Sequence, residues 1–517
     1  MLGRGAQIPS LESRLRATHG EVGASRAYDS GAMSDELNKP PTDLVSLLPE
    51  RWAELATGIC RTLERGGHRG WIVGGAVRDL LLGREIKDVD LVSAARPEEV
   101  EALFDRTVAV GKSFGIIVVV LGGEEVELAT FRRERGYSDR RRPDEVVYAA
   151  APEEDAERRD FTCNALYLDP LSGEIRDPAG GLADLKSGVL RAVGDPAGRF
   201  REDGLRILRM ARFHAALDLQ PAPGLLAAAQ AERSALTGVS AERVRDELQK
   251  ILLADRAHRA VRVLVDGGHA ELVLPPMGTV VEVEARLGVL AALGVNWGDA
   301  GAAGVKETTE NEATAMEAIA GAAGAGHGEP ARQLRWEIGL SVLFGPLECE
   351  PEAGDEGPST LSLVESLDAL RCSREERRVV TEVTIGSLEL RSLVGRPGSE
   401  ALSALASPQG AEARGRLIQL WRRPTRAAAA QLALVLEATL VNAGAAGALR
   451  VVLGQLEELD AGAPVSPVTL SAGDLQDLGV PRGPLLGALL RRVQLASLGG
   501  AFESRAGAMD WARDQLR

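Results

Sequence analysis

Two aspartates, Asp88 and Asp90, stand two positions apart in the segment 87–91. The apolar residues around them predict a strand over Val89–Val92, and side chains two positions apart on a strand project from the same face. Two like charges that close are unfavourable unless a cation lies between them. Mg²⁺ is commonly bound by one or two carboxylates together with substrate phosphates. The pair therefore predicts a Mg²⁺ site for phosphate chemistry, whereas a solvated strand edge is the simpler interpretation of such a pair in isolation.

A glycine turn lies shortly upstream of the aspartates. Gly74 and Gly75 separate the apolar run Trp71–Val73 from a predicted helix over Ala76–Leu82. Two glycines at this junction let the backbone approach a ligand, and the helix N-terminus behind them favours an anion. Arg78, early in that helix, offers a phosphate a fork of donors. The glycines alone are equally typical of a tight strand–helix junction, but together with the aspartate pair they indicate a phosphate-and-metal site.

A second charged pattern lies in a predicted helix over Asp203–Ala216. Asp203, Arg206, Arg209 and Arg212 recur every third residue, so neighbouring members lie beside each other on the helix. An aspartate accepts from an amino group and an arginine offers two parallel donors, so the two can pair with the edge of a nucleotide base. On spacing alone, a solvent-exposed helix with internal ion pairs is the simpler interpretation.

Strands and helices alternate around these residues. Apolar runs at Ile116–Leu121 and Val126–Phe131 predict two further strands, joined by a Gly122-Gly123 turn, and the stretch Leu44–Leu63 predicts a helix. This mixture indicates an α+β domain with a small mixed or antiparallel sheet across about 65–195.

From Arg199 onward helical periodicity dominates, interrupted by acidic segments at Asn296–Gln333 and Glu348–Pro358 that we interpret as flexible insertions. The expected organisation is an α+β head followed by an all-α neck, body and tail. Its segments are a disordered extension over 1–43, the head over 44–195, the neck over 196–275, a helical body with the acidic insertions over 276–365, and a helical body and tail over 366–517.

Bulk properties limit the cellular setting. None of the 517 residues lies in an apolar run long enough to cross a bilayer, and the four cysteines form no CxxC pair. We therefore expect a cytoplasmic protein with reduced thiols. The formal net charge of −15 argues mildly against a general nucleic-acid binder, but arginines cluster over 132–142 and 199–212, which allows a locally basic groove.

Several segments occur in a fixed order along the first part of the chain. They are Gly74–Asp79 with Asp88–Asp90, Glu127–Arg132, Arg158–Leu166, Asp177–Leu185 and Glu202–Phe213. These segments resemble the motifs of the CCA-adding enzyme and bacterial poly(A) polymerase family, the eubacterial-type branch of the nucleotidyltransferase superfamily. The third is similar to its RRDFTxNA motif and the last to its EDxxRxLRxxRF helix. The strong resemblance covers about 70–215, and a weaker one extends over most of the remaining chain.

The resemblance implies roles for these residues. Asp88 and Asp90 would hold Mg²⁺ in a two-ion site, with Glu127 as a third catalytic carboxylate. Asp203 and Arg206 would act as a protein template that selects C or A, with CTP and ATP as substrates. Cys163 stands where the family usually has a β-branched residue, and a buried thiol can replace it as a small hydrophobe. The nucleotide-binding candidates are Gly74, Gly75, Arg78, Arg159, Asp160, Asn164, Asp203, Arg206, Arg209 and Arg212.

One of these candidates has a structural alternative. Arg159 and Asp160 precede a predicted helix that carries Asn164, so Asp160 can also serve as the N-cap of that helix.

A basic loop follows the third predicted strand. The segment Phe131–Pro143 holds six arginines with a glycine and a tyrosine, and it resembles the flexible loop of enzymes that add the terminal A. A solvated charged loop is the alternative interpretation. The residues we expect to contact RNA are Arg133, Arg135, Tyr137, Arg140, Arg141 and Arg142.

The expected function is template-independent addition of C and A, or of A alone, to the 3′ end of tRNA. The segment Leu470–Gly487 resembles the C-terminal part of tRNA-directed members. The alternative is a bacterial poly(A) polymerase, but Gly111–Gly115 lacks the additional basic residues and histidine associated with that branch. A non-catalytic RNA-binding relative would be expected to lack Asp88 or Asp90. We expect tRNA, CTP and ATP as partners, and neither a membrane nor DNA.

Overall fold

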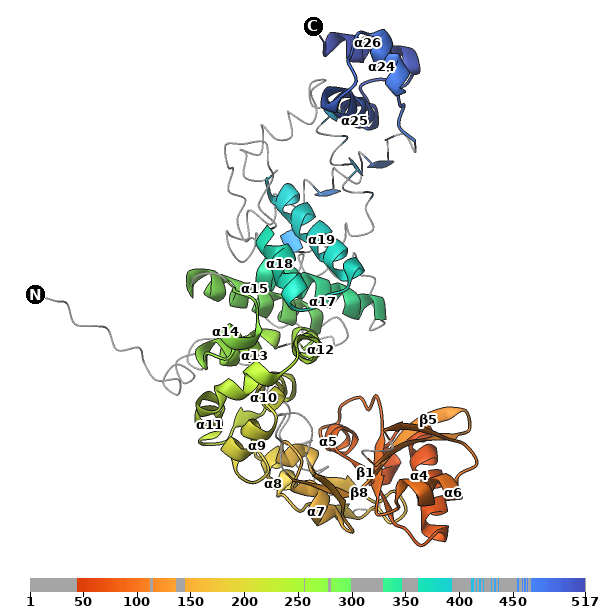
Figure 1. Cartoon of the computed structure of the whole chain (residues 1–517), viewed down its shortest axis with the longest axis vertical. Helices are drawn as coiled ribbons and strands as arrows, with labels where there is room; N and C mark the ends of the chain where they lie inside the picture. The colour runs from red at the N-terminus through yellow and green to blue at the C-terminus, as the bar shows by residue number, and fades with distance from the viewer. Residues whose placement is uncertain are drawn as a thin grey trace, which may run out of the picture. The chain divides into compact units, whose positions relative to one another are not determined.

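The computed structural model describes residues 44–111, 115–135, 145–254, 256–277, 280–298, 329–345, 361–392 and 466–516, with scattered positions between 411 and 463 (Figure 1). The basic loop beyond Arg135 and most of both acidic insertions lie outside the described residues. The chain divides into two compact units, one formed by Met1–Ile251 with Arg259–Leu274, the other by Leu252–His258 with Pro275–Arg517.

A seven-stranded mixed sheet forms the centre of the first unit, in the order β3-β4-β5-β2-β1-β8-β9. Strands β1 and β2 are antiparallel, β2 and β5 are parallel, and the β4–β5 hairpin turns at two positive-φ glycines. The strands are β1 Gly70–Val73, β2 Asp90–Ser93, β3 Thr107–Gly111, β4 Ile116–Leu121, β5 Glu124–Thr130, β8 Tyr167–Leu168 and β9 Ile175–Arg176.

Helices α4 (Glu50–Arg65) and α6 (Pro97–Leu103) lie side by side and pack on this sheet (Figure 1). Leu55, Ile59 and Leu63 recur at intervals of four residues on one side of α4, and all are buried because this spacing places them on a single stripe. Close packing is possible because Gly70 of β1 has no side chain, since a Cβ there would stand 2.6 Å from the Cys60 Sγ.

Short elements and the first long helices complete the first unit. They are η1 Val45–Leu47, α5 Gly75–Leu81, β6 Arg132–Arg135, β7 Glu145–Tyr148, α7 Pro152–Ala156, η3 Thr162–Asn164, α8 Gly181–Lys186, β10 Val189–Leu190, α9 Pro196–Glu202, α10 Leu205–Leu217, β11 Gln220–Pro221, α11 Leu225–Ala231, η4 Arg233–Gly238, α12 Ala241–Leu252, α13 Ala257–Asp266 and α14 Ala270–Val273.

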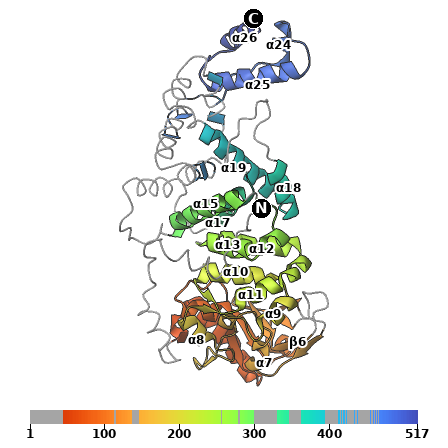
Figure 2. The same cartoon turned by 90° about the vertical axis from the view of Figure 1, so that its left-hand side faces the viewer.

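The described part of the second unit is helical. Arg286 of α15 is buried and donates to the carbonyl oxygens of Met277, of Val342 in the last turn of α17, and of Gly345, which directly follows α17. The last three helices enclose their own core around Leu475, Leu489 and Val493 and lie together in both views (Figures 1 and 2). The helices are α15 Val280–Gly298, α17 Glu329–Phe344, α18 Leu361–Ala369, α19 Arg374–Ser392, α24 Ala472–Asp477, α25 Pro484–Leu498 and α26 Arg505–Asp514.

The predicted fold class, an α+β head followed by helical segments, is confirmed. Several local predictions need correction. The helix expected over Leu44–Leu63 begins at Glu50, because Pro49 stands in an extended conformation at its N-cap. Both ends of the predicted insertion Asn296–Gln333 are helical, in α15 and α17. Within the described residues no helix is both long and apolar enough to span a membrane.

The helix expected over Asp203–Ala216 begins at Leu205, after a break that separates it from α9. Helix α9 ends at Glu202, Asp203 is extended with φ −146° and ψ 106°, and α10 begins at Leu205. Gly204 lies against the backbone of η4, where a Cβ would stand 2.3 Å from the carbonyl oxygen of Ala235. Tertiary packing therefore sets this break, which helical periodicity cannot reveal.

Candidate nucleotide-binding and metal site

The sheet register gathers the predicted metal site at one end of three strands. Val73 of β1 is paired with Asp90 of β2, and Leu91 of β2 with Leu128 of β5. Glu127 therefore lies beside Asp90, and the turn after Val73 lies beside Asp88. Asp88 itself is in coil two residues before β2, which corrects the prediction that it lies on the strand. Both aspartates are nevertheless exposed on either side of buried Val89.

Asp90 has an unusual titration. Partial removal of its carboxylate from water, together with the negative charges of Asp88 and Glu127, raises its pKa to about 6, while the charge of Arg159 opposes the rise. A group of neighbouring carboxylates whose ionised form is disfavoured has the electrostatics that a bound cation relieves.

The three carboxylates do not form a ready-made cage. In the described part of the chain no group of three or more His, Cys, Asp and Glu side chains is arranged to hold a metal ion. Mg²⁺ tolerates this arrangement, because it usually keeps waters and takes one or two carboxylates plus substrate phosphates. The exposed oxygens of Asp88 and Asp90 fit that requirement, and Glu127 acts on Asp90 through its charge.

The glycine turn leaves room for arginine side chains. Gly74 has φ +74° and ψ −124°, a conformation that side-chain-bearing residues rarely adopt, and a Cβ there would stand 3.4 Å from Nη1 of Arg159. Arg78 of α5 is buried and donates from Nη1 to Oδ1 of Asn164 at 2.7 Å and from Nε and Nη2 to the carboxylate of Asp79. Its guanidinium is therefore held in place before any ligand arrives.

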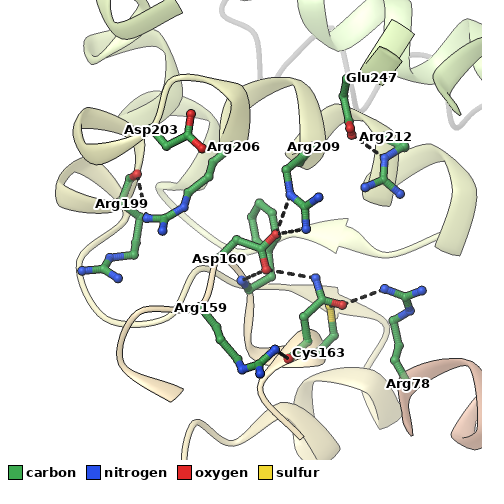
Figure 3. Close-up of polar contacts among 12 residues, drawn as sticks. Arg78, Arg159, Asp160, Cys163, Arg199, Asp203, Arg206, Arg209, Arg212 and Glu247 are labelled. Carbon is green, nitrogen blue, oxygen red and sulfur yellow. Dashed lines mark hydrogen bonds and ion pairs between the residues drawn. The ribbon is translucent and has the colours of Figure 1, made fainter. Parts of the chain in front are cut away.

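Asp160 is buried at the centre of a polar network (Figure 3). It accepts from Nε of Arg209 at 2.7 Å, from the Asn164 amide at 3.0 Å and from the backbone N–H of Phe161. Burial by itself raises the pKa of Asp160, but the charge of Arg209 and these hydrogen bonds hold it well below the usual range. Because Asn164 also accepts from Arg78, one chain of contacts joins α5 to α10.

Two structural expectations for this segment are wrong. Asp160 is not a helix N-cap, because Phe161 holds the N-cap position of the 3₁₀ turn η3, and Asn164 ends that turn instead of lying in an α-helix. The Cys163 thiol is buried, and burial raises its pKa to about 12, which is consistent with a small hydrophobe.

Three guanidinium groups surround the buried ring of Phe213. Those of Arg78, Arg209 and Arg212 lie 5.2, 5.2 and 4.1 Å from its centroid. Arg212 also pairs with Glu247 of α12 (Figure 3). Burial lowers the pKa of Arg212, the charge of Glu247 raises it only in part, and the like charges of Arg209 and Arg78 add to the lowering. Cations packed this closely favour an anionic ligand.

Sequence reasoning missed Asp155, the fully buried carboxylate that holds Arg159. Its Oδ2 accepts from Arg159 Nη2 at 3.0 Å and from the Tyr167 hydroxyl at 2.9 Å, and its Oδ1 accepts from Arg158. Burial raises the pKa of Asp155, but the two arginines lower it on balance. The i, i+3 and i, i+4 spacing to Arg158 and Arg159 was visible in the sequence and could have identified it.

Arg206 is buried, and protein acceptors hold it on two sides. Its Nη1 donates to the Arg199 carbonyl at 3.1 Å and to Glu202 at 2.6 Å, and its Nη2 donates to the Arg158 carbonyl at 3.0 Å. Within the described structure the Asp203 carboxylate does not pair with the Arg206 guanidinium. Figure 3 shows Asp203, Arg206, Arg209 and Arg212 following one another along this part of the chain.

The predicted RNA-contact residues lie largely outside the described residues. The structure does not describe Tyr137, Arg140, Arg141 and Arg142, nor the side chain of Arg135. Arg133, on β6, pairs through Nε with Glu154 of α7 at 2.9 Å. The backbone N–H of Arg132 donates to Asp155 at 3.3 Å, so the start of this segment is tied to the same helix that positions Arg159.

Comparisons with known proteins agree with the sequence motifs. Residues 70–191 match the family model of the poly A polymerase head domain. Residues 218–278 match the model described as "Probable RNA and SrmB- binding site of polymerase A". The resemblance stated from the motifs is confirmed by these matches.

Curated relatives carry a more specific name. The chain is 43% identical over 210 residues to a CCA-adding enzyme of Bacillus pumilus, a match that covers 41% of this chain and 52% of the relative. It is 41% identical over 222 residues to a CCA-adding enzyme of Lactobacillus helveticus, covering 43% and 55%. These matches thus span about half the length of the curated relatives.

Solved structures extend the likeness over most of the chain. The CCA-adding enzyme of Bacillus stearothermophilus in complex with CTP superposes with a TM-score of 0.59 at 26% identity, covering 91% of this chain and 98% of that one. The Thermotoga maritima CCA-adding enzyme complexed with tRNA superposes with a TM-score of 0.57 at 19% identity, covering 93% and 99%, which indicates a shared fold.

Proposed function

We propose that this chain, whose residues 70–191 belong to the poly A polymerase head-domain family, is a metal-dependent tRNA nucleotidyltransferase. It adds C and A, or A alone, to the 3′ end of tRNA from CTP and ATP and releases pyrophosphate. The names of the curated relatives support tRNA as the acceptor, and the CTP complex of the Bacillus stearothermophilus enzyme supports the nucleotide substrate. Such an enzyme acts where tRNA matures, so we also propose a cytoplasmic location.

Asp88 and Asp90 would hold Mg²⁺, as their accessibility and the raised pKa of Asp90 favour. When bound, Mg²⁺ makes the acceptor hydroxyl easier to deprotonate and neutralises the triphosphate and leaving pyrophosphate. Glu127 would strengthen the field at this site. Gly75 and Arg78 would contact the triphosphate together with Arg209 and Arg212. Arg159, held by Asp155, would contact the ribose and phosphates.

The role of Arg206 in base selection is supported by the number of its N–H donors that the protein leaves unused. A guanidinium has five N–H donors, and three are used by the carbonyls of Arg158 and Arg199 and by Glu202. Two donors, one of them the Nε–H, remain within the described structure. A guanidinium fixed on two sides with donors left over can pair with the acceptors of a base edge without reorganising. Asp203, next to it in the chain, would supply the complementary acceptor.

The poly(A) polymerase alternative shares the same head motifs. We favour tRNA because the curated relatives reported above are CCA-adding enzymes and because 111–115 lacks the extra basic residues of the polymerase branch. Contact between the basic loop and RNA stays a prediction. The residues concerned are Arg133, Arg135, Tyr137, Arg140, Arg141 and Arg142.

The test is incorporation of labelled CTP and ATP, with Mg²⁺, onto tRNA lacking CCA, tRNA ending in C-C, complete tRNA and an unstructured RNA. Addition of two Cs and one A, stopping there, is the expected result. Use of the C-C-ended tRNA alone would make the chain an A-adding enzyme. Unlimited addition of A to any RNA would establish the polymerase alternative, and no addition to any acceptor would contradict both.

A further inference from the structure

Arg243, a residue without an assigned role, forms a two-pronged contact with Asp203. Nη1 of Arg243 donates to Oδ1 at 3.2 Å, and its Nη2 donates to Oδ2 at 2.8 Å. The two residues are 40 positions apart, Arg243 on α12 and Asp203 in the break between α9 and α10. Both side chains are partly shielded, with 24% and 17% of their surfaces exposed. A planar fork meeting a carboxylate in this way fixes its orientation as well as its position.

The contact removes the last freedom of Asp203. Its main chain is already fixed, because Gly204 packs against the Ala235 carbonyl. Its Oδ1 also accepts from the backbone N–H of Leu205 at 3.1 Å. Rotation of the carboxylate about its side-chain bonds is the remaining movement, and the fork of Arg243 opposes it.

The two carboxylate oxygens are not equally occupied. Each accepts up to two hydrogen bonds. Oδ1 accepts from Leu205 and from Arg243, whereas Oδ2 accepts from Arg243 alone within the described structure. Oδ2 is therefore the oxygen with an acceptor position left for a ligand.

The chemistry of the bases makes the orientation of that oxygen important. Cytosine and adenine carry an exocyclic amino group, a donor, where uracil and guanine carry a carbonyl oxygen, an acceptor. An ionised aspartate only accepts, so a fixed Oδ2 binds an amino group and repels a carbonyl. If the carboxylate could rotate, it could turn its oxygens away from the carbonyl group of uracil or guanine. The repulsion that excludes these bases would then weaken.

We propose that Arg243 is the positioning residue that holds Oδ2 of Asp203 toward the incoming base, and so sets the discrimination of amino-bearing from carbonyl-bearing nucleotides. The inference rests on the proposed function and deepens it. Arg243 acts through Asp203 and does not touch the nucleotide. Lysine cannot replace it, because an ammonium group is a single point of charge without the planar fork.

A purely structural role makes a different prediction. If the pair only fastened α12 to the start of α10, then Arg243→Lys and Arg243→Gln would reduce the use of all nucleotides in the same proportion. A positioning role changes the ratio between nucleotides in protein that remains folded.

The experiment measures kcat/KM for CTP, ATP, UTP and GTP on tRNA lacking CCA and on tRNA ending in C-C, with the full chain. We expect Arg243→Lys and Arg243→Gln to lose roughly tenfold in the preference for CTP over UTP and for ATP over GTP. The choice between C and A at each step should stay. Arg245→Lys is the matched control, since Arg245 lies on the same helix and pairs with exposed Asp246, and it should keep the wild-type ratios.

Unchanged ratios in a folded Arg243→Lys variant would overturn the inference. Equilibrium binding of CTP and UTP to the wild type and to the same variants gives the ratio without catalysis. A wild-type chain that adds nothing to tRNA would therefore contradict the proposed function, while the binding ratio would still decide the role of Arg243. Circular dichroism and thermal unfolding show whether each variant is folded before its kcat/KM and binding ratios are compared.

Discussion

Two charged regions of the first unit differ in how their charges are balanced. At the N-terminal end of β2, Asp88, Asp90 and Glu127 lie together. The pKa of Asp90 is set by burial and by the charges of its neighbours. Around α10, Arg206, Arg209 and Arg212 each have a carboxylate partner, in Glu202, Asp160 and Glu247. The first region carries negative charge that Arg159 offsets only in part, and a ligand must balance the rest. The second holds its charges in place before the ligand binds.

This difference separates two requirements. Chemistry at a phosphate needs charge that a metal ion can neutralise, so leaving carboxylates uncompensated is useful and costs stability. Selection of a base needs donors and acceptors at fixed positions, so buried partners hold them. Changes at the metal region should therefore affect rate, and changes at Asp203 and Arg206 in the second region should affect which nucleotide is used.

The largest effect is expected for Asp90→Ala. Loss of a metal ligand removes several kcal/mol of transition-state stabilisation, so incorporation into tRNA should fall by at least about 10³-fold. The measurement is the single-turnover rate of CTP addition. Glu125→Ala is the matched control, because Glu125 is also an exposed acid on β5 and lies outside the proposed site. A near wild-type rate for Asp90→Ala would remove the metal assignment.

Asp155→Asn should have a mixed effect. It leaves Arg158 and Arg159 without their buried counter-charge, which typically costs about 3–5 kcal/mol of folding free energy. In the folded fraction, a loosened Arg159 should raise the KM for CTP and ATP roughly tenfold, with little change in the KM for tRNA.

Urea unfolding and steady-state kinetics at varied nucleotide measure the two effects of Asp155→Asn. The control is Glu157→Gln, an exposed residue at the end of the same helix. An equal rise in both KM values would show that Asp155 does not act through Arg159.

A smaller effect concerns stability and pH at Asp90. Its pKa is raised in the folded chain to about 6, from its usual value of 3.8, so above pH 6 the folded state carries a charge that the unfolded state bears more easily. Asp90→Asn should therefore raise the melting temperature at pH 7.5 in EDTA by a few degrees, discounted because the side chain is exposed. The gain should shrink as pH falls through 6 toward 4, because the folded wild-type carboxyl becomes protonated and the unfolded one approaches its own pKa.

Thermal unfolding at pH 7.5 and 4.5 measures this difference. Mg²⁺ should stabilise the wild type at pH 7.5 and have less effect on the variant. A lower melting temperature for Asp90→Asn at pH 7.5 without metal would contradict the uncompensated charge.

Whether a feature of these regions can be predicted from the sequence depends on whether local residues or distant contacts cause it. The aspartate pair, the glycine turn and the strands beside them follow from spacing and turn residues, which are local signals. The break before Leu205 was not predicted because it depends on Gly204 meeting the backbone of η4. The pairing of Arg243 with Asp203 joins positions 40 residues apart, which no single-chain pattern reveals.

The central claim is that one region sets the rate and the other selects the base. Its most direct test is the sequence of the tRNA 3′ ends that Arg206→Lys makes from an equal mixture of all four nucleotides. This change keeps the positive charge beside Glu202 but removes the fork of donors. The account predicts that nucleotides are still added, at a rate well above that of Asp90→Ala, and that the added bases no longer follow C, C, A. Tails that keep the wild-type sequence would contradict the account, because base selection would then not depend on Arg206.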